Sequence, residues 1–368
     1  MKIGVPKEIK NNEGRVSMTP SSVKEYILKG HEVFVQKTAG EKSGFTDAEY
    51  IEVGAKMVDT AEEAWNCEMV VKVKEPLHEE YKYFKEDMIL YTYLHLAAEK
   101  DLTDALLNSK VTGIAYETVV ENGRLPLLRP MSEIAGRRAV TVGQQFLESH
   151  NGGKGILLGG APGVERGVVT IIGDGVSAIN AAKMAIGLGA EVYLLALFED
   201  RIRYLDEIFD KQLTVVKSNE ANISKYSKIS DLLISTVLIP GEKAPKIVKE
   251  YMVKDMKKGS VIVDISIDQG GSVETIDRIT THDNPVFEKY GVLHYSVANM
   301  PGAAPRTATV GLTNATTNFG VQIATFGLEA IIKSEPIRTG VNTFKGKITN
   351  KGVAKAFEIE CYDVLELM

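Results

Sequence analysis

The stretch VVTIIGDGVSA, residues 168–178, decides the fold of this chain. Val168–Ile172 is nearly continuously apolar, which is typical of a strand with both faces of its sheet covered. The turn Gly173–Ala178 follows with the spacing G-x-G-x-x-A, and an alanine-rich helix is predicted over Ala178–Gly187. This arrangement predicts a dinucleotide site, because the glycines permit a tight turn and close approach of a pyrophosphate to the helix N-terminus. A tight strand-to-helix turn without a ligand is the alternative interpretation.

The second strand of this unit is predicted over Glu191–Leu195, and an acid at its end normally binds the ribose of NAD. Ala196 stands at that position instead. Glu199 and Asp200 follow shortly afterwards, but both are also interpreted as acids in the first turn of a helix. Arg201 follows them and is a candidate partner for the 2′-phosphate of NADP. The residues therefore leave the preference between NAD and NADP open.

Working outward, β-rich runs alternate with amphipathic ones, which is the pattern of βαβ units and parallel sheets. Earlier strands are predicted over Lys2–Val5, Glu32–Gln36, Met69–Val73, Met88–Leu94 and Gly113–Tyr116, and later ones over Leu232–Ser235 and Ser260–Ile267. Four helices are predicted from their capping signals and periodicity. The first covers Pro20–Lys29, the second follows a capping box that begins at Thr46, the third runs from Ser132 to about His150, and the fourth covers Ala308–Lys333.

We therefore expect an α/β fold with two Rossmann-like domains, each with a parallel sheet, separated by a cleft and joined by long helices. The last long helix is interpreted as the return of the chain into its first domain. This predicts a discontinuous substrate-binding domain, residues 1–128 and 307–368, and a dinucleotide-binding domain, residues 129–306.

Composition excludes several classes of protein. The 368 residues are 44% hydrophobic and 25% charged, which is ordinary for a globular enzyme. A formal charge of −6 gives no electrostatic support for a nucleic-acid partner. Cys67 and Cys361 are too few for a disulfide framework and lack metal-type spacing. With no targeting segment and no apolar run long enough for a membrane helix, we expect a soluble protein of the cytoplasm.

Three candidate chemical groups fall at predicted strand ends or in a polar loop of the first domain. Arg15 lies in the loop, and Lys74 and His95 end two strands. Arg and Lys together suit a small carboxylate, and His exchanges protons near neutral pH. Lys72 is an alternative to Lys74. Each residue also has a plainer interpretation, namely a solvated surface charge for the cations and a core residue for His95.

In the second domain, Asp264 and Asp268 lie in and after the predicted strand Ser260–Ile267. Asp268 precedes a Gly-Gly turn and is the better candidate for the cleft. Its alternative interpretation is a turn-forming aspartate. Residue spacing alone therefore predicts no more than a nucleotide-dependent enzyme whose substrate is a small anion.

Several longer blocks make the chain resemble the L-alanine dehydrogenase family from end to end. These blocks surround Arg15, Lys72–Pro76, Leu94–Ala98, Ala115–Thr118, Met131–Arg137, Asp264–Gly271 and Val297–Pro301. The resemblance implies reversible oxidative deamination of L-alanine to pyruvate and ammonia with NAD, in a homohexamer without nucleic-acid or membrane partners.

The resemblance also implies roles for individual residues. Arg15 and Lys74 would hold the substrate carboxylate, His95 would act as acid and base, and Asp268 would position and deprotonate water or the amine. The cofactor contacts that it implies, together with those of the glycine-rich turn and the following strand, are Ser132, Gly173, Gly175, Val176, Ala178, Ala196, Arg201, Ser218, Val237, Leu238, Ile265, Ser266, Ile267, Asp268, Arg278, Val297, Ala298, Asn299 and Met300.

The same family contains the nucleotide-binding part of proton-translocating transhydrogenases, which remains an alternative together with a catalytically silent nucleotide-binding module. The presence of all four substrate-type residues, Arg15, Lys74, His95 and Asp268, favours the dehydrogenase. This sequence departs from the family pattern at Ala178, where a third glycine is usual, and at Ala196, where the pattern has Asp. Because of Ala196, we expect NADP to be accepted beside NAD.

Overall fold

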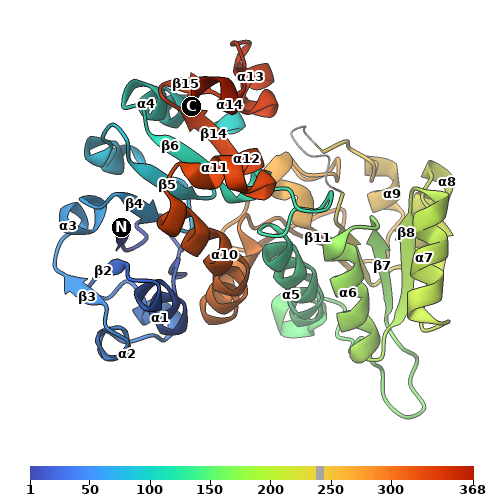
Figure 1. Ribbon diagram of the computed structural model, residues 1–368. Helices are drawn as coiled ribbons and strands as arrows, with labels where there is room; N and C mark the ends of the chain where they lie inside the picture. Colours follow the sequence, from blue (N-terminus) through green and yellow to red (C-terminus); the bar gives the residue numbers. More distant parts are fainter. Residues whose placement is uncertain (238–243) are drawn as a thin grey trace. The chain divides into compact units, whose positions relative to one another are not determined.

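The computed structural model describes residues 1–237 and 244–368, and these form two compact units. Unit 1 consists of Met1–Met131 and Gly302–Met368, and unit 2 consists of Ser132–Pro301. Each unit contains a sheet with helices packed on it (Figure 1). No helix in the described ranges combines the length and apolarity that a membrane span requires.

The sheet of unit 1 has the strand order β15-β14-β6-β5-β4-β1-β2-β3. Its strands are β1 Lys2–Val5, β2 Glu32–Gln36, β3 Lys56–Val58, β4 Met69–Val71, β5 Ile89–Thr92, β6 Thr112–Ala115, β14 Val341–Phe344 and β15 Lys347–Ile348. The strands from β6 to β3 are parallel, whereas β14 and β15 are antiparallel to their neighbours.

The sheet of unit 2 has the strand order β12-β13-β11-β10-β7-β8-β9. Its strands are β7 Val168–Ile172, β8 Glu191–Ala196, β9 Thr214–Lys217, β10 Leu232–Ser235, β11 Val261–Asp264, β12 Val286–Lys289 and β13 Val292–Tyr295. All pairs are parallel except β12 with β13. The parallel centre of both sheets is as predicted.

Each sheet also has an antiparallel edge, which the predicted parallel sheets did not include. A two-residue turn joins each edge pair, Tyr290-Gly291 in unit 2 and Lys345-Gly346 in unit 1, and all four residues have positive φ. Two consecutive residues with positive φ form the tight turn that matches the twist of a hairpin. The chain therefore reverses at these points instead of crossing over through a helix.

The helices of unit 1 are α1 Pro20–Leu28, α2 Asp47–Glu52, α3 Ala61–Trp65, α4 Lys100–Asn108, α10 Pro305–Phe326, α11 Glu329–Lys333, α12 Glu335–Gly340, α13 Lys351–Phe357 and α14 Val364–Leu367. Helix α5, Arg129–Leu147, begins in unit 1 and continues into unit 2. Unit 2 also contains α6 Val176–Gly187, α7 Glu199–Phe209, α8 Glu220–Ile229 and α9 Glu250–Lys254.

Local capping signals place the first helices as predicted. The Thr19 hydroxyl accepts the N–H of Ser22 at 3.2 Å, and Thr46 and Glu49 form the expected capping box. The prediction of one continuous helix over residues 308–333 is wrong, because α10 ends before Gly327, whose φ is +56°. Glycine adopts a positive φ without the steric cost that other residues incur, so the helix ends at this residue.

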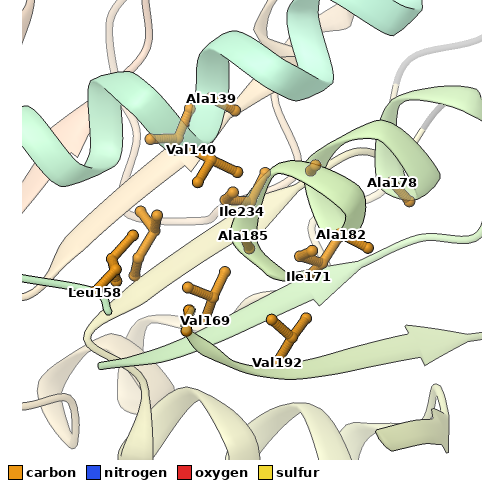
Figure 2. Close-up of a cluster of buried hydrophobic side chains, with 14 of the residues drawn as sticks. Ala139, Val140, Leu158, Val169, Ile171, Ala178, Ala182, Ala185, Val192 and Ile234 are labelled. Atoms are coloured by element: carbon orange, nitrogen blue, oxygen red, sulfur yellow. The ribbon is translucent and has the colours of Figure 1, made fainter. Parts of the chain in front are cut away.

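The core of unit 2 lies on both faces of its sheet. On one face, side chains of α5 and α6, among them Val140, Ala182 and Ala185, pack over Val169 and Ile171 of β7 (Figure 2). On the other face, Ile172, Leu195 and Leu233 pack with Val248 and Met252. Burial on both faces accounts for the continuous apolar strands of the sequence.

Candidate active site

Arg15 is buried in unit 1 and is held by Glu13. The carboxylate of Glu13 accepts two hydrogen bonds from the guanidinium, from Nε at 2.7 Å and from Nη2 at 2.5 Å, and one from the Arg15 backbone N–H. Only 2% of Arg15 is exposed. Burial lowers the pKa of Arg15, but the contact with Glu13 outweighs it and leaves the pKa raised. The guanidinium is therefore charged and fixed in its plane.

Lys72 is excluded as an alternative to Lys74. It is completely buried, and its ammonium lies 2.8 Å from Glu80 and 3.2 Å from Glu8. Glu8 also accepts the backbone N–H of Val73 at 2.7 Å, just after β4 ends. Burial raises the pKa of Glu8 despite the neighbouring Lys72. Lys72 thus belongs to a buried ion-pair network below the strand end.

Lys74 lies beyond this network and is more accessible, with 15% of its side chain exposed. Its ammonium lies 3.6 Å from the carboxylate of Glu75, which is also paired with Lys10. Burial raises the pKa of Glu75, but Lys74, Lys10 and the nearby His95 outweigh it and hold the pKa below its usual range. A charged Glu75 therefore balances the cations around it.

His95 follows β5 and is exposed, with a left-handed backbone at φ +51°. Glu117 holds this conformation, because its carboxylate accepts the backbone N–H of His95 at 2.6 Å and that of Leu94 at 3.1 Å. The imidazole stacks on Tyr93 with ring centroids 6.0 Å apart. A non-glycine residue in this region is uncommon and is often found at functional sites.

These contacts bring Arg15, Lys74 and His95 into one neighbourhood of unit 1. Tyr93 interacts electrostatically with Arg15 and stacks on His95, while Glu75 interacts with both Lys74 and His95. The interpretations of His95 as a core residue and of Arg15 as a solvated surface charge are wrong, since His95 is exposed and Arg15 is buried. The sequence pattern assigns no role to the acids Glu13, Glu75 and Glu117, because their partners are recognised only in the folded structure.

In unit 2, the glycine-rich turn has the conformation that a phosphate-binding loop needs. Gly173 has φ +123°, and a Cβ at this residue would lie 2.3 Å from the Thr236 hydroxyl. A Cβ at Gly175 would meet nothing within 4 Å, so the turn is open there. Val176 begins α6, and Ala178, in the first turn of that helix, is fully buried. The backbone thus fits a pyrophosphate at the helix N-terminus.

The end of β8 carries several charged groups around Ala196, which is itself fully buried. The carboxylate of Asp174 accepts the backbone N–H of Leu197 at 3.1 Å, and Arg201 donates to the backbone carbonyl of Asp174. Glu199 is the first residue of α7 and lies 3.2 Å from the ammonium of Lys217. Glu199 and Asp200 therefore occupy the first turn of a helix, as the plainer interpretation has it.

The two acids of the third candidate region differ in environment. Asp264 ends β11, is completely buried and accepts backbone N–H groups of Ser266, Ser272 and Val273. Asp268 is exposed in the short 3₁₀ helix Ile265–Gln269, which replaces the predicted end of the strand. Its carboxylate faces the backbone N–H of Asn299 at 3.4 Å. Asp264 therefore holds the loop, and Asp268 is the accessible acid.

The remaining cofactor candidates lie at several places in unit 2. The Ser132 carbonyl accepts the hydroxyl of Ser177, and the N–H of Ser218 donates to the Ala196 carbonyl at 2.7 Å. Arg278 is paired with Asp277 at 2.7 Å. Val237 follows β10, whereas Leu238 lies outside the described residues. Val297, Ala298 and Met300 lie near Asn299 in the segment after β13.

Fold and site define a nucleotide-binding α/β protein with a sheet in each of two units. Family models for the alanine dehydrogenase/PNT N-terminal and C-terminal domains match residues 4–135 and 139–351. The alanine dehydrogenase of Staphylococcus epidermidis is 57% identical over 98% of both chains. That of Methanococcus maripaludis is 56% identical over 98% of this chain and 97% of its own. The chain therefore belongs to the alanine dehydrogenase/PNT family, whose cofactor is a pyridine nucleotide.

Solved structures agree with this assignment. A structure of L-alanine dehydrogenase is 48% identical and superposes with a TM-score of 0.95, covering 97% of this chain and 99% of its own. A transhydrogenase from Sinorhizobium meliloti covers 95% of this chain and 99% of its own with a TM-score of 0.82. Its identity is 23%, so this second likeness shows the fold alone.

Proposed function

We propose that the chain catalyses the reversible oxidative deamination of L-alanine, in which alanine, NAD⁺ and water give pyruvate, ammonia and NADH. The observation that carries this proposal is the 56–57% identity to alanine dehydrogenases over nearly the whole chain. The nicotinamide accepts the hydride from Cα, and the protein contributes alignment, charge and proton transfer. The open turn at Gly175 supports binding of its pyrophosphate in unit 2.

Arg15 and Lys74 are the proposed ligands of the substrate carboxylate. Glu13 fixes the Arg15 guanidinium in one orientation, so a substrate would meet a cation that is already ordered. Lys74 adds a second, more accessible charge. Each charge-assisted hydrogen bond of this kind contributes about 1.5–3 kcal/mol. The pair therefore suits the carboxylate that alanine and pyruvate share.

His95 is the proposed acid and base for the substrate oxygen, and Asp268 is proposed to position and deprotonate the attacking water or the amine. His95 is exposed and its backbone is held by Glu117, which supports a fixed direction for proton transfer. Asp268 is exposed in a loop that Asp264 anchors from beneath. Both residues therefore combine accessibility with a supported backbone.

NAD is the proposed cofactor, and we expect NADP to be accepted as well. Ala196 offers no side-chain acceptor to a ribose and no negative charge against a 2′-phosphate. Arg201 and Lys217 place positive charge near the same strand end. These features support acceptance of both NAD and NADP, with a modest preference for NAD.

The transhydrogenase component is the alternative function within this family. It is disfavoured because the solved transhydrogenase is 23% identical, whereas the alanine dehydrogenases are 56–57% identical. We also propose that the chain forms a homohexamer and acts in the cytoplasm. The free cysteines, buried Cys67 and exposed Cys361, agree with a reducing compartment. Light scattering of the purified chain tests the hexamer.

A steady-state assay of the purified chain tests the proposed function. L-Alanine should reduce NAD⁺, and pyruvate with ammonia should oxidise NADH, while D-alanine serves as the matched control and should give no reduction. NADP⁺ is assayed in parallel. Hydride exchange between the two nucleotides without any alanine-dependent reduction would contradict the proposal and favour the transhydrogenase alternative.

A further inference from the structure

Asp174, the residue between the first two glycines of the turn, brings a carboxylate to the end of β8. Its Oδ2 atom accepts the backbone N–H of Leu197 at 3.1 Å. Leu197 directly follows Ala196, the position at which a dinucleotide-binding fold normally carries its ribose-binding acid. The turn thus supplies a carboxylate to a strand end whose own side chain has none.

The backbone on both sides of this carboxylate is fixed. The N–H of Gly173 donates to the Leu195 carbonyl at 3.0 Å, and Arg201 donates to the carbonyl of Asp174 itself. A side chain at Gly173 would collide with Thr236, so the turn has little freedom to rearrange there. Together with the hydrogen bond from Leu197, these backbone contacts orient the Asp174 carboxylate.

This carboxylate has the capacity to accept further hydrogen bonds. An ionised carboxylate offers about four lone-pair sites, and the bond from Leu197 uses one of them. In the ranges 1–237 and 244–368, no second group donates a hydrogen bond to the Asp174 carboxylate, since Arg201 donates to the backbone carbonyl. Ribose hydroxyls are donors that match such an acceptor, whereas a 2′-phosphate has only acceptors and a negative charge that the carboxylate repels.

We propose that Asp174 is the ribose-binding, cofactor-discriminating acid of this chain and takes the place of the acid absent from position 196. The inference rests on the proposed function, because it concerns the adenosine ribose of that reaction's cofactor. The carboxylate favours NAD, and the cation of Arg201 beside it reduces the penalty against NADP. Because the two charges act in opposite directions, we expect only a modest preference for NAD over NADP.

Glu199 is the competing acid, and its contacts differ. It is exposed on the first turn of α7 and faces the ammonium of Lys217 at 3.2 Å rather than the N–H groups at the end of β8. It carries the same charge as Asp174 and lies close to the same strand end. Glu199→Gln is therefore the matched control for a general change of charge.

The test is calorimetric binding of ADP-ribose and of 2′-phospho-ADP-ribose to the full chain and to Asp174→Asn. Asparagine keeps an oxygen for the Leu197 N–H and removes the charge, so a purely structural role predicts no change. We expect ADP-ribose to bind to Asp174→Asn about tenfold more weakly than to the unchanged chain, because one hydrogen bond to a charged group is lost. The 2′-phosphorylated ligand should bind equally well or more tightly, and Glu199→Gln should leave the ratio of the two affinities unchanged.

An unchanged ratio in Asp174→Asn and in Asp174→Ala, both verified as folded by thermal melting, overturns the inference. An equal shift in Glu199→Gln overturns it too, since a general electrostatic effect then suffices. Failure of the proposed function is a separate result: a wild-type chain that binds both ligands and does not oxidise alanine contradicts the reaction, while the binding ratio still decides the role of Asp174.

Discussion

The guanidinium of Arg15 and the carboxylate of Glu13 meet in a two-point ion pair, at 2.7 Å from Nε and 2.5 Å from Nη2, inside unit 1. Both side chains are almost completely buried. Breaking a buried pair by removing one partner costs about 3–5 kcal/mol, because an uncompensated charge remains. Glu13 is therefore part of what keeps Arg15 available as a cation.

Arg15→Ala and Lys74→Ala should raise the KM for pyruvate far more than the KM for NADH, because the two cations are matched to one carboxylate. Steady-state kinetics with each substrate varied in turn measures both constants. Arg15→Lys, which keeps a charge opposite Glu13, separates loss of binding from loss of the fold. Exposed Lys100, which pairs with Asp104, provides the control variant Lys100→Ala. A pyruvate KM that stays unchanged in both site variants would refute the assignment.

His95→Ala and Asp268→Ala should abolish turnover while NADH still binds, because both residues serve proton transfer. General acid–base groups typically contribute about 10²–10⁴ in rate. Stopped-flow or steady-state kcat and the fluorescence of bound NADH give the two readouts. The proposed roles are wrong if both variants keep more than about a tenth of kcat, which is a loss under ~1.4 kcal/mol.

Ala196→Asp should shift the ratio of kcat/KM for NAD to that for NADP towards NAD. The new carboxylate accepts ribose hydrogen bonds and repels a 2′-phosphate, and the gain in NAD affinity is about tenfold to a hundredfold. Because Ala196 is fully buried, we also expect a lower melting temperature. A ratio that does not move would remove position 196 from cofactor selection, leaving Asp174 and Glu199 as the candidates.

Asp231→Asn should destabilise unit 2 in a pH-dependent way. Burial raises the pKa of Asp231, but Lys154, the Val168 N–H and Lys257 outweigh it and lower the pKa below 3.8. A lowered folded-state pKa contributes stability that is present above the unfolded value and is lost as pH falls through the folded one. We expect a cost of about 1–3 kcal/mol at neutral pH that shrinks below about pH 4.

Urea unfolding of this variant at neutral and acidic pH measures the difference in unfolding free energy. Asp59→Asn removes an exposed partner of Lys37 and serves as the control, for which little change is expected. A cost for Asp231→Asn that is the same at both pH values would show that its hydrogen-bond geometry, and not its charge, stabilises the fold.

Local signals made much of the fold predictable. The bounds of β1 and β2 agree with the predicted ranges, and the hydroxyl groups of Thr19 and Thr46 cap the helices they precede. The strand predicted over Met69–Val73 ends earlier, because Glu8 binds the N–H of Val73 in place of a neighbouring strand. Such a competing contact depends on a residue far away in the sequence and is invisible to periodicity.

The site shows the same division. The cations Arg15 and Lys74 are predictable as carboxylate ligands because of their residue types and their positions, Arg15 in a polar loop and Lys74 at a strand end. The acids that hold the site come from elsewhere: Glu117 binds the backbone of His95 across 22 residues, and Asp174 reaches Leu197 across 23. No spacing rule links residues that only the fold brings together, so these roles required the structure.

The pairing of β14 with β6 has a consequence for the order in which the two units fold during synthesis. Residues of unit 2 are all synthesised by Pro301, whereas the sheet of unit 1 lacks two strands until residues 341–348 emerge. Domains usually fold in the order of their synthesis. Unit 2 is therefore complete first, and β6 keeps an unpaired edge until β14 has been synthesised.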